Sequence, residues 1–263
     1  MNSLIINIFY LFFILDECVE CRTRLVSNSG QLRNTLRIVN AGDTIQLRDG
    51  LYSGIFVANR FGTVTDPIRL VGSRRAILSN NRGTAFYLTG RYWFISGFTV
   101  SNSRRGIAVQ SGDNNVLERL MIRNIGEEGI ALRQDSDDNV IRNCIITRTG
   151  IQSPNLGFGI SIGSDERQSY RGYVDRSDRN IIIGNSFQTG SPAEAIHAYE
   201  GTCCGNIREN TFDGRPVTNA NNIQQFNRCW VSINGNRYTV DNNSGRNTAG
   251  DGFRVKTIVF KTK

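Results

Sequence analysis

IGNSF at residues 183–187 returns as RENTF at residues 208–212, which lie 25 positions further along the chain. A second repeat has a period of 24, because Asn115-Val116 is followed by Asn139-Val140. Repeats of roughly 20 to 50 residues are typical of stacked units that bury their apolar faces only against neighbouring units. The chain is therefore predicted to fold as a solenoid.

Each repeat unit holds short runs of Ile, Val, Leu and Phe separated by Gly, Asn, Asp and Ser. This pattern indicates short strands joined by turns and has no helical period. The 27 glycines and many asparagines suit tight corners, because both residues tolerate positive φ. The Leu-x-x-Leu-x-Leu ladder of leucine-rich repeats is missing. We predict an all-β fold, a right-handed single-stranded parallel β-helix.

The predicted β-helix has about nine coils between Gly42 and the C-terminus, and at about 4.8 Å per coil it is roughly 45 Å long. Residues 22–263 are predicted to form one domain, because no Pro- or Ser-rich linker divides them. The period is interrupted by an insertion at about 148–178. Such loops project from one face of a solenoid, often the binding face, although an ordinary decorated loop is the alternative. A second irregular stretch, residues 215–229, is predicted to wall the other side.

The N-terminus carries an apolar run at residues 4–15, followed at once by Asp16 and Glu17. A run of this length is too short to span a bilayer but suits the core of a signal peptide. We predict a signal peptide at residues 1–21 and a secreted protein. The alternative is an N-terminal cap strand or helix of the solenoid. No second apolar segment is long enough to cross a membrane.

The formal net charge of +8 favours a polyanionic partner. Nucleic acid and acidic polysaccharide both qualify, and a merely solvated basic surface is the alternative. Nucleic acid is disfavoured, because the leader directs the chain out of the cell and the repeats offer no helix for a groove. We expect a monomer that binds acidic polysaccharide.

The chain has six cysteines, which fit an oxidising compartment. Cys144 lies within a predicted strand and is interpreted as an inert core thiol. Cys203, Cys204 and Cys229 form the predicted disulfide set. Zinc is a poor alternative, because His197 is the single histidine of the sequence.

Side chains of a strand alternate between its two faces, so inward residues fix which residues point outward. The coils align on inward Ile107, Ile130, Ile160, Ile196, Val231 and Phe253. A first outward column then holds Ala108, Ala131, Ser161, His197, Ser232 and Arg254. A second holds Gln110, Arg133, Gly163, Tyr199, Asn234 and Lys256. The alignment predicts a polar strip around His197 and Tyr199, with cations above and below it.

These cations are candidates for binding an acidic glycan. The predicted substrate-binding residues are Arg133, Arg254 and Lys256 of the strip, with Arg171 and Arg176 of the insertion. Arginines beside aromatic residues suit pairing with carboxylates and stacking on sugar rings.

Two segments resemble a known family. GDTIQLRDGLYS at residues 42–53 and DPIRL at residues 66–70 look like the opening coils of pectin-lyase-like β-helix proteins. EAIHAYEGT at residues 194–202 resembles the active-site coil of the chondroitinase B and alginate lyase group. The likeness extends from about residue 25 to 255, and these segments are its specific parts.

The resemblance implies β-elimination on uronic acids. In that family a carboxylate-bound Ca²⁺ neutralises the acid group of the substrate, a lysine abstracts the C5 proton and an arginine assists. Glu194 corresponds to an acidic metal ligand, and Glu200 is the second candidate ligand. Tyr199 stands where the lysine is expected, and Arg208 and Arg215 are candidates for the arginine.

Because Tyr199 stands at the lysine position, two assignments of the catalytic base remain. Tyrosine acts as a base only when neighbouring cations lower its pKa, for which Arg133 and Lys256 are candidates. Alternatively, His197 takes the proton while Tyr199 donates to the leaving oxygen. Two hypotheses follow. One is a secreted polysaccharide lyase, and the other is a non-catalytic β-helix that binds acidic glycan after losing the lysine.

Overall fold

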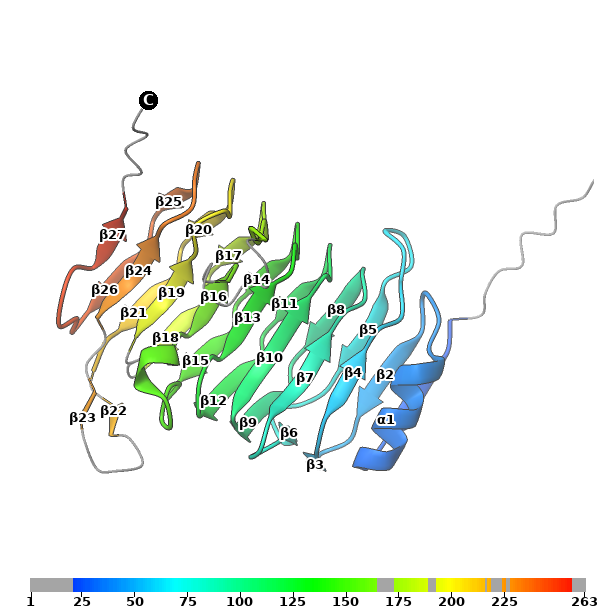
Figure 1. The fold of residues 1–263 in the computed structure, drawn as a ribbon. Coiled ribbons are helices and arrows are strands. Elements are labelled where there is room, and N and C mark those ends of the chain that lie inside the picture. Colours follow the sequence, from blue (N-terminus) through cyan, green and yellow to red (C-terminus); the bar gives the residue numbers. More distant parts are fainter. Residues whose placement is uncertain are drawn as a thin grey trace, which may run out of the picture.

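The protein is a rod of stacked coils in a computed structural model (Figure 1). The structure describes residues 21–164, 173–188, 193–215, 217–218, 224–225 and 228–256. Within them, three parallel sheets of nine, eight and eight strands run along the rod, in agreement with the predicted all-β parallel β-helix. The predicted signal peptide at residues 1–21 lies outside the described residues, apart from Cys21.

Each coil contributes one strand to each sheet. Sheet I holds β1 (Thr23–Val26), β2 (Thr44–Leu47), β5 (Ile68–Val71), β8 (Trp93–Ser96), β11 (Val116–Glu118), β14 (Val140–Arg142), β17 (Ile181–Ile183), β20 (Asn206–Arg208) and β25 (Thr239–Asp241). Sheet II holds β3 (Gly50–Ser53), β6 (Ala76–Ser79), β9 (Thr99–Ser103), β12 (Met121–Ile125), β15 (Ile145–Thr147), β18 (Ser186–Gln188), β21 (Thr211–Asp213) and β26 (Ser244–Arg246). Sheet III holds β4 (Phe56–Ala58), β7 (Thr84–Leu88), β10 (Arg105–Gln110), β13 (Ile130–Arg133), β16 (Ile160–Ile162), β19 (Glu194–Ala198), β24 (Cys229–Ile233) and β27 (Phe253–Val255).

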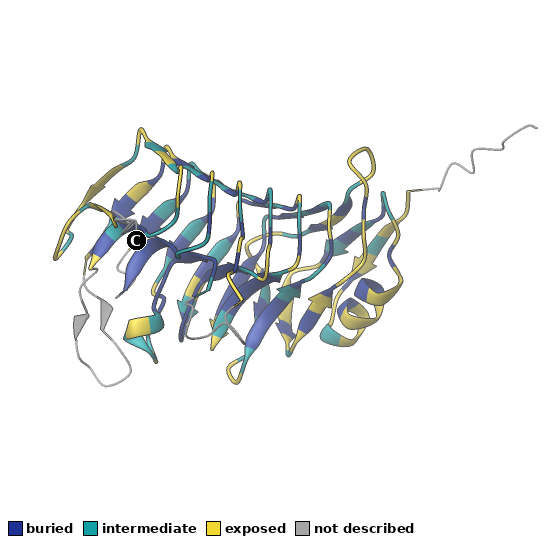
Figure 2. Ribbon diagram, turned by 45° about the horizontal axis from the view of Figure 1, so that its top comes forward, coloured by how far each residue is buried: buried dark blue, intermediate teal, exposed yellow. Residues whose placement is uncertain are grey.

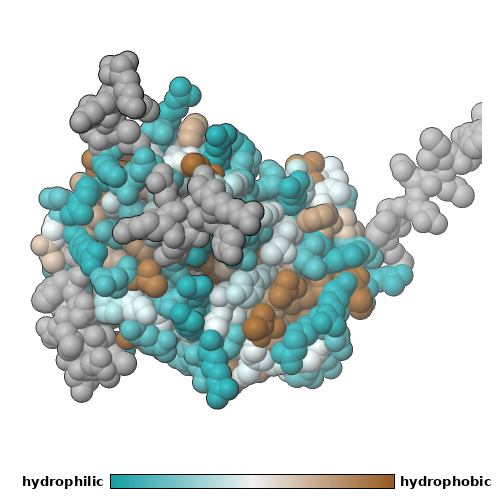
Figure 3. All heavy atoms as spheres, in the orientation of Figure 1, coloured by the Kyte–Doolittle hydropathy of each residue, from teal (hydrophilic) through white to brown (hydrophobic). Residues whose placement is uncertain are grey.

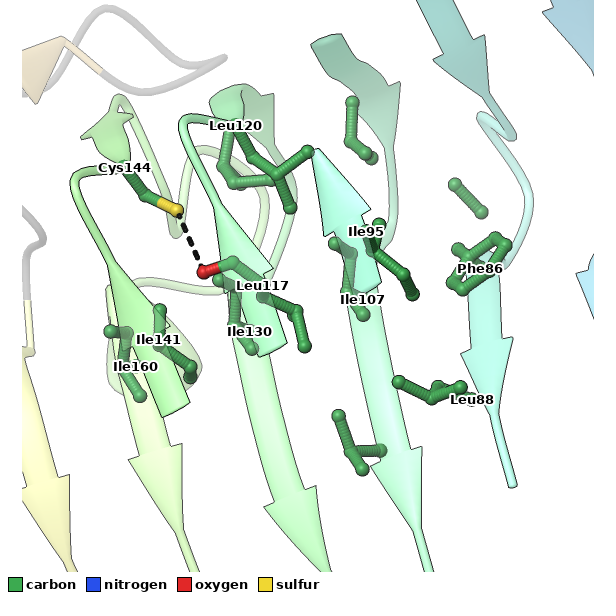
Figure 4. Packing of buried hydrophobic residues seen from close by; sticks show 14 of the residues in the cluster. Phe86, Leu88, Ile95, Ile107, Leu117, Leu120, Ile130, Ile141, Cys144 and Ile160 are labelled. Atoms are coloured by element: carbon green, nitrogen blue, oxygen red, sulfur yellow. Dashed lines mark hydrogen bonds between the residues drawn. The ribbon is translucent and has the colours of Figure 1, made fainter. Parts of the chain in front are cut away.

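The core is a set of apolar columns that fill the inside of the rod. Ile107 pairs with Ile130, Ile130 with Ile160, and Ile160 with Ile196, and all are at most 1% exposed. Figure 4 shows Ile107, Ile130 and Ile160 following one another from coil to coil. Each contributes about 1.5–3 kcal/mol through burial. In Figure 2 buried residues follow the strands, while exposed residues gather in α1 and the projecting turns.

Buried asparagines tie the coils together at two corners. At one, Asn115 N–H donates to Asn139 Oδ1 (3.0 Å), and Asn139 N–H donates to Asn180 Oδ1 (2.9 Å). At the other, Asn185 N–H donates to Asn210 Oδ1 (2.9 Å). The ladder asparagines of the repeat thus supply side-chain hydrogen bonds to the next coil. The residue just before each of them takes positive φ, as at Asp138 (55°), whatever its type.

The N-terminal end of the rod is covered by α1 (Ser29–Ile38), a helix that the repeat pattern did not reveal. Asn28 caps it by accepting from the Gln31 N–H at 2.9 Å. Leu32 and Leu36 are buried and belong to the core. The expectation that the chain offers no helix is therefore wrong at this end. None of the described helices is long and apolar enough to cross a membrane.

The predicted insertion at 148–178 is two loops rather than one, because β16 lies in its middle as a regular strand of sheet III. The first loop contains the 3₁₀ helix η1 (Pro154–Leu156). The second joins β16 to β17. The irregular stretch after residue 214 contains the antiparallel strands β22 (Val217–Thr218) and β23 (Gln224–Gln225).

Cys144 is a buried thiol that donates to the Arg142 carbonyl at 3.4 Å, as expected for a core cysteine. Burial raises its pKa to about 12. Cys203 and Cys204 lie together as a close vicinal pair. Cys229 is a free thiol buried on β24, so the structure does not place it with that pair.

Candidate active site

The outer face of sheet III carries the predicted strip. His197 on β19 pairs with Ser161 on β16 and with Ser232 on β24, which in turn pairs with Arg254 on β27. Ala131 precedes Ser161 in the same column. The first outward column therefore has the register that the sequence indicated.

The second outward column continues just beyond the strand ends. Tyr199 N–H donates to the Ile162 carbonyl (2.8 Å), Asn234 N–H to Ala198 (2.8 Å) and Lys256 N–H to Ile233 (2.8 Å). These bonds extend the parallel ladder by one residue. Tyr199, Asn234 and Lys256 are thus one strand spacing apart, about 4.8 Å per step.

His197 and Tyr199 form an aromatic cluster with Phe158. The His197 and Tyr199 ring centroids lie 4.3 Å apart, edge to face. The Phe158 ring lies 5.2 Å from His197 and 6.1 Å from Tyr199. His197 is 8% exposed and Tyr199 is half-buried, so the phenol is the more accessible group. Phe158 comes from the loop before β16, and nothing in the repeat indicated its role.

Glu194 begins β19 beside this cluster. Its Oε2 lies 3.9 Å from His197 Nδ1, and the residue is 7% exposed. Burial raises the pKa of Glu194, while the nearby Arg228 and Arg254 guanidinium groups act in the opposite direction. A carboxylate in this place can orient the imidazole and stabilise its protonated form.

Three cations lie around the cluster. Arg254 is half-exposed and lies 3.7 Å from Asp251. Lys256 Nζ lies 3.8 Å from Glu200 Oε2, and both side chains are well exposed. Arg228, which the sequence did not single out, donates to Asn155 Oδ1 at 2.6 Å and so links β24 to the η1 loop. These groups give the strip a positive side.

Arg133 is already paired with a carboxylate. Its guanidinium is paired with the buried carboxylate of Glu128, and its side chain is only 17% exposed. Arg105 lies 3.2 Å from the same carboxylate. Much of the Arg133 charge is thereby neutralised two coils away from His197.

Other candidate residues lie apart from the cluster. Arg208 is an exposed residue of β20, which belongs to sheet I, where it pairs with Asp241. Arg215 binds Asp213 at 2.9 Å beside sheet II. Arg176 is exposed in the loop after β16, and its N–H donates to Asp135 Oδ1 at 2.7 Å. Arg171 lies outside the described residues.

The two acidic candidates do not fit a common calcium site. Glu194 begins β19, whereas Glu200 lies in the turn after that strand, beside Lys256. Across the described ranges, no three His, Cys, Asp or Glu residues gather as a metal cage. Ca²⁺ needs six or more oxygen ligands. We therefore derive no step through a metal.

Loops join sheet III to its neighbours at the ends of its strands. The η1 loop leads into β16, β22 and β23 precede β24, and another loop follows β16. Asp175 anchors this last loop, because its carboxylate accepts from Ser164 Oγ (2.6 Å), Ser177 Oγ (2.7 Å) and Gln134 N–H (2.9 Å). The described parts of the 148–178 insertion therefore precede and follow β16, and much of the stretch at 215–229 lies outside the described residues.

The turn after Tyr199 is fixed by hydrogen bonds that involve Thr202 and Tyr238. Thr202 is fully buried, and its hydroxyl donates to the Tyr199 carbonyl at 2.7 Å. Tyr238 donates its hydroxyl proton to Thr202 Oγ1 at 2.9 Å. A Cβ atom on Gly201, whose φ is +96°, would lie 2.4 Å from Val174, so only glycine lets the anchored loop approach here. These contacts fix the backbone that carries Tyr199.

Comparison with known proteins agrees with this architecture. Residues 46–172 match the model of the right handed beta helix region. A crystal structure of an alginate lyase from Paenibacillus sp. strain FPU-7 is 32% identical, with 85% of this chain and 76% of that chain covered and a TM-score of 0.77. A sequence comparison with curated proteins finds no match.

More distant structures share the fold. Pectate lyase Pel9A is 16% identical over 92% of this chain and 78% of its own, with a TM-score of 0.54. A rhamnogalacturonan lyase is 15% identical over 76% of this chain and 56% of its own, with a TM-score of 0.58. The chain belongs to the right-handed parallel β-helix proteins of the polysaccharide lyase type. Within that class it is similar to the alginate lyase, and the predicted family and handedness are confirmed.

Proposed function

We propose that the protein is a polysaccharide lyase that cleaves a uronate-containing acidic polysaccharide by β-elimination. The observation that carries the proposal is the edge contact of His197 and Tyr199 on a cation-lined sheet face, in a chain 32% identical to an alginate lyase. Alginate is accordingly the first polymer to test. A polymer of this kind lies outside cells, which supports secretion.

β-Elimination needs a base for the C5 proton and an acid for the leaving oxygen. In our proposal His197 removes the C5 proton, and Tyr199 donates its phenolic proton to the glycosidic oxygen at C4. The C4–O bond breaks as a C4–C5 double bond forms. Proton transfer from His197 back to Tyr199 then restores both groups. Their ring contact at 4.3 Å supports a shared proton path.

The uronate carboxylate must be neutralised as C5 loses its proton. Arg254 and Lys256 are the groups we assign to this role, because their own acidic contacts are long, at 3.7 and 3.8 Å. Glu194 orients His197 and stabilises the imidazolium that forms. Burial of Glu194 and His197 strengthens this second effect, because the local dielectric is low.

The test is ultraviolet absorbance of new unsaturated chain ends. Mature protein is incubated with alginate, pectate, chondroitin and dermatan, with and without Ca²⁺. Rising absorbance on one polymer supports the lyase and names its substrate. A flat trace on all four, with retention on an acidic-glycan column, contradicts the lyase and favours the non-catalytic binder.

A further inference from the structure

A second polar surface lies on sheet II, away from the candidate active site. The outer face of β18, β21 and β26 encloses a groove of about 470 Å³, bordered by Arg215. Sheet II meets the solvent on a different side of the coil from sheet III, because each coil places its strands in separate sheets. Neither His197 nor Tyr199 lines this groove.

The groove contains a ladder of hydroxyl groups, formed by Ser186, Thr211 and Ser244. Ser186 pairs with Thr211, and Thr211 pairs with Ser244, so the three are one strand spacing apart. In the preceding coils the same column holds Met121 and Ile145. The hydroxyl ladder is therefore a local change of chemistry and not a property of the whole face.

Asp213 organises two arginines at the edge of the ladder. Arg246 donates to Asp213 Oδ2 from Nε at 3.2 Å and from Nη2 at 3.1 Å. Arg215 Nε lies 2.9 Å from the same oxygen, and Asn247 donates to Oδ1 at 2.9 Å. Burial alone would raise the pKa of Asp213, but the hydrogen bonds from Asn247 and Arg246 leave it below the usual value. Asp213 is thus an ionised anchor.

Both guanidinium groups keep donors for a ligand. The Arg215 side chain is 57% exposed and that of Arg246 is 73% exposed, whereas Asp213 is 11% exposed. An arginine has five N–H donors, of which Arg246 spends two on Asp213. Two guanidinium groups beside the single Asp213 carboxylate leave the groove with a net positive charge. Such a surface presents preorganised donors for carboxylates and hydroxyls together.

We propose that this groove is a second, non-catalytic binding site for acidic polysaccharide. The uronate carboxylates pair with Arg215 and Arg246, and the sugar hydroxyls bind along the hydroxyl ladder. The repeat of the ladder along the rod suits a polymer of similar units. The site holds a long chain on one face while sheet III acts on another. The choice of acidic glycan as ligand rests on the proposed function.

The experiment measures retention on immobilised alginate and pectate by affinity electrophoresis. One variant, Thr211→Trp, fills the groove without changing charge. A second, Arg215→Ala with Arg246→Ala, removes the cations. The matched control is Arg37→Ala with Arg48→Ala, which removes two exposed arginines at the other end of the rod. All are made in a Tyr199→Phe background so that the polymer is not cut, and thermal melts confirm folding.

Both groove variants should weaken retention about tenfold at low salt, and the control should not. In the wild-type background the same groove variants should cleave short oligouronates at the unchanged rate. Unchanged retention, or an equal loss in the control, overturns the proposal. If the wild-type protein forms no product but the groove variants alone lose retention, the lyase fails and this site stands. If the wild-type protein forms product but the groove variants keep full retention, the lyase stands and this second site fails.

Discussion

At the scale of single residues, the strip on sheet III follows from strand alternation. The sequence placed His197, Ser232 and Arg254 in one column, and the structure has this register. Phe158 and Arg228 could not be found in the same way, because they reach the cluster from loops whose path no repeat determines. The strand period fixes which way a side chain points but not which loop covers it.

Replacing His197 with Ala or Tyr199 with Phe should reduce turnover by about 10²–10⁴, because each removes one proton-transfer group. Initial rates of absorbance change measure this. Melting temperature and glycan retention should stay near the wild-type values, since neither substitution removes the inward core. A parallel loss of folding in both variants would mean that the two rings are structural.

The raised pKa of Glu194 predicts that the free energy of unfolding depends on pH. Its pKa is raised in the folded state, so the native protein binds this proton more tightly than the unfolded chain. Stability from this group is present at low pH and is lost as pH rises from the ordinary value of 4.5 through the raised pKa. Glu194→Gln should therefore gain melting temperature relative to wild type between pH 4 and pH 7. The opposite trend would show that the ionised carboxylate is stabilised instead.

At the scale of structural elements, the strands were predictable and the end cap was not. Strands recur with the repeat, so each copy supports the others. The helix α1 occurs once, and its signals are local, namely the Asn28 cap and the buried Leu32 and Leu36. From the sequence, the asparagines of these ladders were visible only as a high asparagine content. Their hydrogen bonds to the next coil emerge only when the coils are stacked.

Asn210→Ala should destabilise the rod by about 3 kcal/mol. The side chain of Asn210 accepts from Asn185 N–H and donates to the Ile182 carbonyl, and both partners lie in the buried corner. Urea denaturation measures the loss. The control Asn34→Ala, on the exposed face of α1, should change stability by less than about 0.5 kcal/mol. Equal effects would contradict a structural role for the ladder.

Thr202→Val tests how the turn below Tyr199 is held. Removing the hydroxyl takes away the 2.7 Å bond to the Tyr199 carbonyl and keeps the longer bond from the Thr202 N–H (3.4 Å). The turn should therefore loosen, so kcat should fall while KM changes little, at a stability cost of roughly 2 kcal/mol. Tyr238→Phe is the control, because it removes the hydroxyl that donates to Thr202 but leaves the bond from Thr202 to Tyr199. If both variants lowered kcat equally, the effect would come from general destabilisation.

At the scale of the whole molecule, the rod separates tasks by sheet. Sheet I carries no part of the cluster, sheet III carries the His197 and Tyr199 strip, and sheet II carries the hydroxyl ladder. Figure 3 shows hydrophobic residues gathered toward the N-terminal end of the visible face, with hydrophilic ones spread over the remainder. In the first outward column, Val57 and Tyr87 precede Ala108, so the polar chemistry is confined to the later coils.

The cations of sheet III also predict the response to chelator. Arg254, Lys256 and Arg228 supply the positive charge near His197. Glu194 and Glu200 belong to no cluster of three His, Cys, Asp or Glu residues in the described part of the chain. Activity of the dialysed protein in EDTA should equal that with added Ca²⁺. A loss of activity in EDTA that Ca²⁺ restores would contradict this assignment.

The most direct test of the account is the mass of the products formed from a purified oligouronate of defined length. Elimination splits the chain without adding water, so the masses of the two products should sum to that of the substrate, and one product should carry the unsaturated end. This is the result we predict. Products whose masses sum to one water more than the substrate would show hydrolysis and would contradict β-elimination by His197 and Tyr199.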